Sequence, residues 1–402
     1  MITYEQFIRK SIISKESIDL FLDDSRPTWC QFDPDTGYIL GNSLLNDGMD
    51  GCATISTTQK SGYRTTHIYA DRKCRINTYG NSFTHCLQVS DGETWQEYLA
   101  GHLGEPIRNY GVGGYGVYQA YRRMVKAEQT DDDAKYVILY IWGDDHCRSV
   151  MRCRHAVIYP WWDIHDGLTF HGNFWSNVEM DLESGRFVEK PNILFTPESL
   201  YQMTDPEFMF DALKDDLMAQ LYSIRDADPS SLDLESLNAL AEVLGVPGLG
   251  KMKDDSMEAI KAWMEELKNA YGFAATKYTI EETLKFCKDN DKELLILLLC
   301  PRVTPQLLNN QPRYDQEIVD YLDENKLLYF DMNVAHFEDY KSFNLSVRDY
   351  MKRYFIGHYS PVGNHLFAYS IKDTIVDWLD PKPITYRTDN QKLDDFSSYM
   401  SN

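Results

Sequence analysis

Residues 75–116 constrain the fold of this chain more than any other stretch. The β-prone segment 75–79 ends just before Ser82, and a capping-box pair then opens an amphipathic helix. A second short strand at 107–110 leads into residues 111–116, four of which are glycine. The stretch therefore predicts a strand–helix–strand unit with a serine after its first strand and bare backbone after its second.

This unit suggests a chemical role for Ser82. Backbone N–H groups in a glycine-rich turn can approach a ligand closely, as they do where they stabilise an oxyanion beside a nucleophile. The alternative is structural, because serine is a common turn and cap residue and glycine serves tight turns. The stretch alone leaves both interpretations open.

The remaining strands predict the fold class. Residues 136–142 form a continuous apolar run, typical of a strand buried on both faces, and further strands are expected at 293–300 and 327–334. With helices between them, these strands predict an α/β protein, a flavodoxin-like three-layer α/β/α sandwich with a parallel central sheet. Ligands bind such sheets outside the carboxyl ends of the strands.

Four regions and a tail are expected along the chain. Between residues 146 and 275, helices are expected at 205–221, 232–244 and 255–271, and a further helix is expected at 276–290. The regions are an N-terminal helix and β-rich appendage (1–74), the sheet domain (75–145 and 276–388), an insertion that is a candidate cover for the substrate site (146–275), and a polar tail (389–402).

Charge and cysteine usage narrow the function classes. The formal net charge of −22 disfavours nucleic acid and anionic membrane surfaces as partners. No apolar run approaches the roughly 20 residues of a membrane span, and the N-terminus shows no secretory signal. The eight cysteines lack metal-ligand spacing, so we expect reduced thiols, a cytoplasmic location and no metal.

Four short segments, in order, resemble the sequence blocks of the SGNH (GDSL-type) serine hydrolases. This resemblance implies that Ser82 is the nucleophile, that its N–H and that of Gly114 line the oxyanion hole, and that His358 is the general base. The segments are GNSFT (80–84), NYGVGG (109–114), YIWGDD (140–145) and GHYSPVGNH (357–365).

Three positions depart from the family pattern. Asn81 stands where the family commonly has aspartate, and Phe355 where it has the aspartate that orients the histidine. Asp145 stands where the family has an asparagine that donates to the oxyanion. An ionised carboxylate cannot donate, so Asp145 must be protonated, turned away, or paired with Arg148 or Arg152.

The group that supports His358 is open in the sequence. Asp331 and Asp349 are nearby carboxylates, but neither has the family spacing. We therefore expect a Ser82–His358 dyad in which a backbone carbonyl accepts the Nδ1–H. Without a buried anion, the histidine pKa is expected near its ordinary value of about 6.5.

Two sets of residues are candidates for substrate binding. Arg148, Arg152 and Arg154 follow the third block and either hold an anionic substrate group or form scaffold ion pairs. Trp161 and Trp162, with Trp175, either line the site as part of the insertion or fill its core.

These expectations converge on a serine esterase without a cofactor. It would hydrolyse an O-acyl ester, possibly an acetyl ester, of a small molecule or carbohydrate. Acyl transfer on the same scaffold and a non-catalytic binding protein with a degenerate site are the alternatives. The sequence does not fix the oligomeric state.

Overall fold

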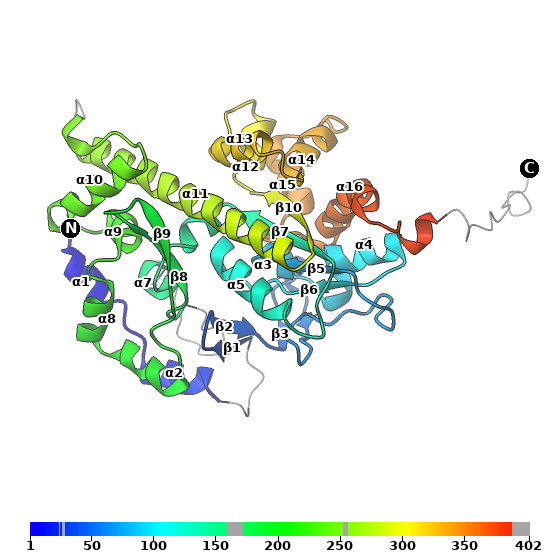
Figure 1. Cartoon of the computed structure of the whole chain (residues 1–402), viewed down its shortest axis with the longest axis horizontal. Helices are drawn as coiled ribbons and strands as arrows, with labels where there is room; N and C mark the ends of the chain where they lie inside the picture. The colour runs from blue at the N-terminus through cyan, green and yellow to red at the C-terminus, as the bar shows by residue number, and fades with distance from the viewer. Residues whose placement is uncertain (24, 26–28, 159–171, 252–255, 388–402) are drawn as a thin grey trace, which may run out of the picture.

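A five-stranded, all-parallel sheet forms the centre of the computed structural model, which describes residues 1–23, 25, 29–158, 172–251 and 256–387 (Figure 1). The expected α/β class with a parallel central sheet is confirmed. Parallel strands present their carboxyl ends at one edge, so the segments that follow β5, β6 and β7 lie together. Across the sheet the order is β11 (Tyr329–Asp331), β10 (Glu293–Leu299), β7 (Tyr136–Trp142), β5 (Ile76–Tyr79) and β6 (Ile107–Asn109).

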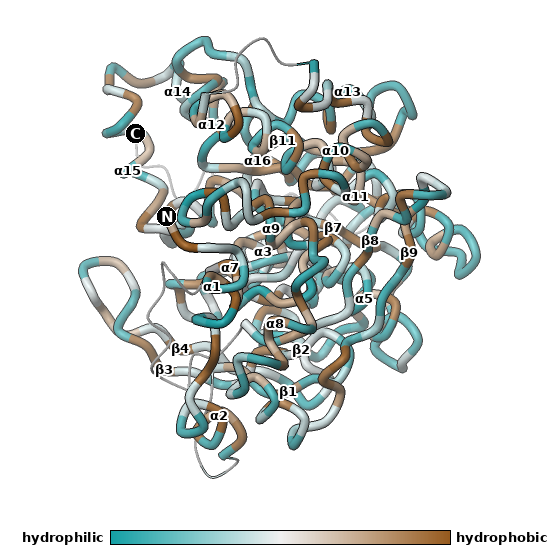
Figure 2. The backbone as a smooth tube through the Cα atoms, turned by 90° about the vertical axis from the view of Figure 1, so that its left-hand side faces the viewer, coloured by the Kyte–Doolittle hydropathy of each residue, from teal (hydrophilic) through white to brown (hydrophobic). Residues whose placement is uncertain are grey.

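Both faces of the sheet are buried against helices. Along β7, Val137 and Leu139 belong to one apolar cluster, and Ile138 and Tyr140 to a second, as the alternation of side chains across a strand requires. Most loops at the periphery are hydrophilic (Figure 2). Helices α5 (Val117–Ala127), α11 (Met257–Asp289) and α13 (Gln316–Glu324) contribute to the first cluster. Helices α4 (Trp95–Leu103), α14 (Met332–Tyr340), α15 (Val347–Tyr354) and α16 (Pro361–Trp378) contribute to the second, and α12 (Val303–Leu308) packs on α14.

One helix replaces the two expected at 255–271 and 276–290. Helix α11 runs without a break through Gly272 and crosses the molecule in Figure 1. A Cβ at Gly272 would lie 2.9 Å from the backbone nitrogen of Cys147, which follows β7 in the short helix α6 (Asp145–Arg148). This glycine therefore permits close packing of two helices and does not end one, and the domain boundary expected at 275 falls inside α11.

The N-terminal region and the insertion pack on each other. Helix α1 lies against α8, and Ile2 donates a backbone hydrogen bond to Asp226. The N-terminal elements are α1 (Tyr4–Arg9), α2 (Lys15–Phe21), β1 (Cys30–Asp33), β2 (Gly37–Leu40), β3 (Ser43–Leu45) and β4 (Thr54–Ser56). Those of the insertion are α7 (Arg154–Ile158), β8 (Asn177–Asp181), β9 (Arg186–Lys190), α8 (Pro206–Leu213), α9 (Leu217–Ser223) and α10 (Leu234–Val243).

Two other expected elements differ in extent. The helix expected at 205–221 is divided into α8 and α9, because Asp216 caps a new helix by accepting from Ala219 N at 3.0 Å. The strand expected at 327–334 keeps only three residues, because Asp331 caps α14.

Candidate active site

Ser82 begins the four-residue helix α3 (Ser82–His85), directly beyond the carboxyl end of β5. Asn81 caps this helix by accepting from Phe83 N at 2.7 Å. The turn before it requires glycine, since a Cβ at Gly80 would lie 2.2 Å from Thr84 Oγ1 and 2.7 Å from Tyr140 O. The serine is therefore held at the sheet edge by a tight turn and a capped helix.

His358 comes from the loop before α16 and meets Ser82 across 276 residues of sequence. The distance between His358 Nε2 and Ser82 Oγ is 2.7 Å. This separation lies within the range in which a general base takes a hydroxyl proton. The two residues expected to be the catalytic pair are thus brought together.

Gln88 fixes the tautomer of His358. Its Oε1 accepts from His358 N at 2.7 Å and lies 3.0 Å from His358 Nδ1, while its Nε2 donates to Asp47 O at 3.0 Å. These two backbone contacts set the orientation of the amide, so Oε1 is the acceptor facing Nδ1 and Nδ1 carries the proton. Nε2 is then free to accept from Ser82, as a general base must.

The sequence predicted that a backbone carbonyl accepts the Nδ1–H of His358. This prediction is wrong, because the acceptor is the side-chain amide of Gln88. The two candidate carboxylates are engaged elsewhere: Asp331 pairs with Arg313, and Asp349 accepts from Ser346 Oγ at 2.6 Å. Phe355, at the family's aspartate position, stacks on Tyr359 with ring centroids 4.5 Å apart.

The loop that carries Gln88 is held by a buried arginine. Cys86 and Gln88 have φ angles of 64° and 68°, left-handed conformations that are unusual for residues other than glycine. Arg64 donates to His85 O at 2.6 Å, to Cys86 O at 2.8 Å and to Val89 O at 2.7 Å. The N-terminal region thus imposes the strained loop geometry that places Gln88 beside His358.

A glycine allows Gln88 to reach His358. Gly357 has a φ of 119°, and a Cβ there would lie 2.6 Å from Gln88 Oε1. A side chain at this position would therefore push the amide away from the histidine.

Gly114 lies in the cavity wall with Ser82, as the resemblance implies for an oxyanion donor. Its φ is 88°, a conformation that favours glycine. Tyr38 donates its hydroxyl to Gly113 O at 2.8 Å. Because the peptide is planar and trans, this bond also fixes the direction of Gly114 N–H, which points the opposite way from that carbonyl.

Asp145 is an acceptor in the structure, and of the alternatives left open by the sequence the pairing with Arg148 is the one observed. The carboxylate is buried, accepts from Trp142 N at 3.0 Å and from Arg148 Nη1 at 3.0 Å, and receives the Asn81 amide. Burial raises the pKa of Asp145, and the positive charge of Arg148 opposes this shift. Asn81 and Asp145 thus form an amide–carboxylate pair in which the two residue types are exchanged relative to the family pattern.

A cavity of about 510 Å³ opens beside Ser82 and His358, a volume suited to a small-molecule ligand. Three of its lining residues come from the N-terminal region, which the sequence did not link to the site. The apolar lining side chains are Trp29, Leu45, Phe83, Leu87 and Trp142. Among the described residues of segment 146–275, only Arg148 and Arg154 line it.

The other substrate-binding expectations have mixed outcomes. Arg148 lines the cavity, whereas Arg152 lies outside it. Arg152 forms ion pairs with Glu179 at 2.6 Å and Asp215 at 2.5 Å, which is the scaffold alternative left open by the sequence. Trp161 and Trp162 lie outside the described residues.

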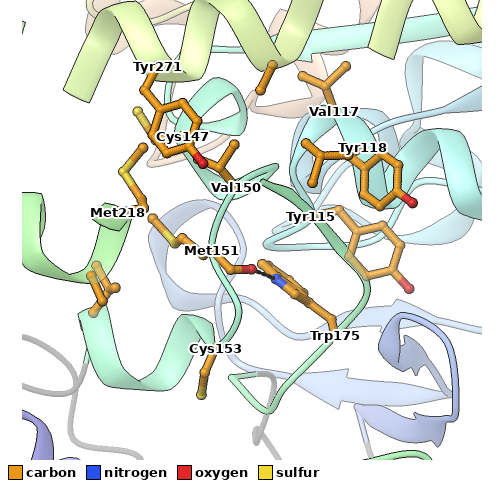
Figure 3. Packing of buried hydrophobic residues seen from close by; sticks show 14 of the residues in the cluster. Tyr115, Val117, Tyr118, Cys147, Val150, Met151, Cys153, Trp175, Met218 and Tyr271 are labelled. Carbon is orange, nitrogen blue, oxygen red and sulfur yellow. Dashed lines mark hydrogen bonds between the residues drawn. The ribbon is translucent and has the colours of Figure 1, made fainter. Parts of the chain in front are cut away.

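Trp175 belongs to the apolar core and not to the cavity wall. Trp175 is 1% exposed, and its indole donates to Met151 O at 2.6 Å and lies beside Tyr115 (Figure 3). The structural interpretation of this tryptophan is therefore the correct one.

The pKa of His358 is lowered to about 4, first by burial and then by the positive charge of Arg148. This value differs from the expected one near 6.5, because that expectation included neither burial nor the charge of Arg148. The imidazole is neutral at physiological pH, which is the state a general base requires.

Sequence reasoning missed Gln88 and Arg64 as parts of the site. No spacing rule marks a side-chain amide as a partner of a distant histidine, and Arg64 acts on backbone carbonyls.

No helix in the described part of the chain is both long and apolar enough to cross a membrane. All eight cysteines are free thiols.

Comparison with known proteins gives no further assignment. No protein-family model matches the chain, and no curated protein sequence matches it significantly.

Proposed function

We propose that this protein is a serine esterase that hydrolyses O-acyl esters of small molecules or carbohydrates. The observation that carries the proposal is the 2.7 Å contact between His358 Nε2 and Ser82 Oγ at the carboxyl edge of the sheet. A serine is a weak nucleophile unless an adjacent base takes its proton, and this contact provides that base.

The mechanism follows from the contacts of the pair. His358 removes the Ser82 proton as Oγ attacks the ester carbonyl, and it returns the proton to the leaving alcohol. Ser82 N–H and Gly114 N–H are the proposed donors to the oxyanion. In the second half of the reaction, His358 removes a proton from water as the water attacks the acyl-enzyme. The proton then returns to Ser82 Oγ, and the acid is released.

Fold details support the assignment to an SGNH-type scaffold. Numbered in chain order, the strands lie 2-1-3-4-5 across the sheet, the order of flavodoxin-like folds. The four resembling segments supply the serine, the glycine turn, the Asp145 turn and the histidine of a single site. The amide–carboxylate pairing of Asn81 and Asp145 favours an intact turn over a degenerate one.

One observation favours catalysis over a non-catalytic binding protein. A non-catalytic binding protein has no need for a serine–histidine contact in which a second side chain also fixes the tautomer. Acyl transfer uses the same residues and differs only in the acceptor. The cytoplasmic location and the absence of nucleic-acid and membrane partners remain expectations from composition.

Substitution of the nucleophile tests the proposal. Ser82→Ala is expected to reduce hydrolysis of short p-nitrophenyl esters by at least ~10³-fold, as removal of a covalent nucleophile does. Thermal unfolding serves as the folding control. Equal turnover by the variant and the parent protein would contradict the assignment of Ser82.

A further inference from the structure

The cavity that holds Ser82 and His358 is also lined by two arginines. Arg148 and Arg154 lie on the short helices α6 and α7, which follow β7 at the same edge of the sheet. Both are largely shielded from solvent: the Arg148 side chain is 13% exposed and the Arg154 residue 7%. Guanidinium groups in such places bind carboxylates and phosphates well, because they offer several fixed donors.

Arg154 lies directly against the candidate oxyanion glycine. A Cβ at Gly114 would be 2.6 Å from Arg154 Nη1, so the guanidinium occupies the space that a side chain would take. Arg154 Nη1 thus lies close to Gly114, whose N–H is a proposed donor to the oxyanion. Arg148 is held by its contact with Asp145 and by the ring of Trp142, 5.4 Å from its guanidinium carbon.

Two cationic side chains and one carboxylate line the cavity among the described residues. Asp47 is the carboxylate that lines the cavity among the described residues, and it accepts a hydrogen bond from Thr54. Asp145 pairs with Arg148. Asp144, whose side chain is half-exposed, has its Oδ2 3.9 Å from Arg148 Nη2. The two guanidinium groups also repel each other: burial, and then the charge of Arg148, lower the pKa of Arg154 to about 10.

We propose that the substrate carries an anionic group, a carboxylate in the simplest case, close to its scissile carbonyl, and that Arg154 with Arg148 binds this group. This inference rests on the proposed esterase function and names its substrate class. A bound anion would also offset the positive charge of Arg148, which disfavours the imidazolium that His358 forms during acyl transfer.

Matched ester pairs test the proposal and distinguish the two sides of the ester. Monoethyl succinate and ethyl 4-methylpentanoate compare an anionic acyl group with a neutral group of the same shape. For the alcohol side, 3-acetoxypropanoate and 3-methylbutyl acetate make the same comparison. The quantity measured is the ratio of kcat/KM for the anionic ester to that for its neutral partner.

The parent protein is expected to prefer the anionic member of at least one pair by more than about 10-fold. Arg154→Gln is expected to lower that ratio about 10- to 100-fold, the loss of one charge-assisted contact. Arg152→Gln, which removes an arginine two positions away and outside the cavity, should keep the ratio. Arg154→Lys serves if the glutamine variant does not fold, and its ratio should fall because the planar fork is lost.

A ratio near one for both pairs in the parent protein would overturn the proposal. Equal losses for both members of a pair in the Arg154 variant would overturn it as well. Calorimetric titration of Ser82→Ala with monoethyl succinate and 3-acetoxypropanoate separates binding from turnover. Arginine-dependent binding without hydrolysis by the parent protein would refute the esterase function and support the anion site.

Discussion

Gln88 provides the most specific test of the catalytic geometry. The variant Gln88→Leu removes Oε1, which accepts hydrogen bonds from the ring Nδ1–H and from the backbone N–H of His358. The first of these bonds strengthens when the imidazole becomes charged, from about 1 kcal/mol for a neutral pair to about 2–3 kcal/mol for a charged one. A differential loss of about 1–2 kcal/mol corresponds to roughly a 5- to 30-fold decrease in kcat.

The variant Gln88→Glu tests the same contact through pH. Activity should rise with pH, because only neutral His358 can accept the serine proton, and in the parent protein it should rise through the histidine pKa of about 4. A carboxylate 3.0 Å from Nδ1 should raise that pKa by roughly 1–3 units. The midpoint of the kcat/KM profile is therefore expected to move upward.

The control is Gln96→Leu. Gln96 is a buried amide near the same loop that donates to Thr78 Oγ1 and Thr84 O, and neither acceptor belongs to His358. Its removal should lower the unfolding temperature without moving the pH midpoint. An unchanged midpoint in Gln88→Glu, or a loss of ~10⁴-fold in Gln88→Leu like that of a triad aspartate, would refute the reasoning.

Three further predictions concern the surroundings of the pair. Arg64→Met should lower both stability and activity by releasing the strained loop, and proteolysis between residues 85 and 89 should report the release. Asn81→Asp would place a second carboxyl group beside Asp145, and it should destabilise the fold. The loss should be larger at high pH, because one of the two carboxyl groups has a raised pKa in the folded state and must then lose its proton. The double variant Asn81→Asp/Asp145→Asn should recover most of the unfolding free energy. Asp331→Asn and Asp349→Asn should each reduce kcat/KM by less than ~10-fold, against ~10⁴-fold for a true triad member; a larger loss from either would reveal a third carboxylate.

Much of the site was predictable because it depends on the order of strands and turns. Ser82 and the glycine turn follow expected strands, and the resemblance assigned His358 before the last helix. Each segment is weak alone, and the order of all four carried the expectation. Parallel pairing then brings Ser82 and the glycine turn together whatever the surrounding packing. The apolar run of β7 likewise predicted a central strand.

The features that sequence reasoning missed depend on tertiary contacts. Gly272 has the local pattern of a helix end, yet it serves the contact between α11 and α6. Arg152 and Arg154 are equivalent in sequence, and only packing sends one to Glu179 and the other to Gly114. The low pKa of His358 arises from burial and from Arg148, neither of which a local pattern specifies.

Labelling with a fluorophosphonate probe tests the central claim most directly, because the probe reacts with an activated serine and traps it covalently. Peptide mass spectrometry should locate the label on Ser82, and His358→Ala should abolish the labelling while the protein remains folded. A label on another serine, or an unlabelled Ser82 in the folded parent protein, would contradict the assignment of Ser82 and His358 as the catalytic pair.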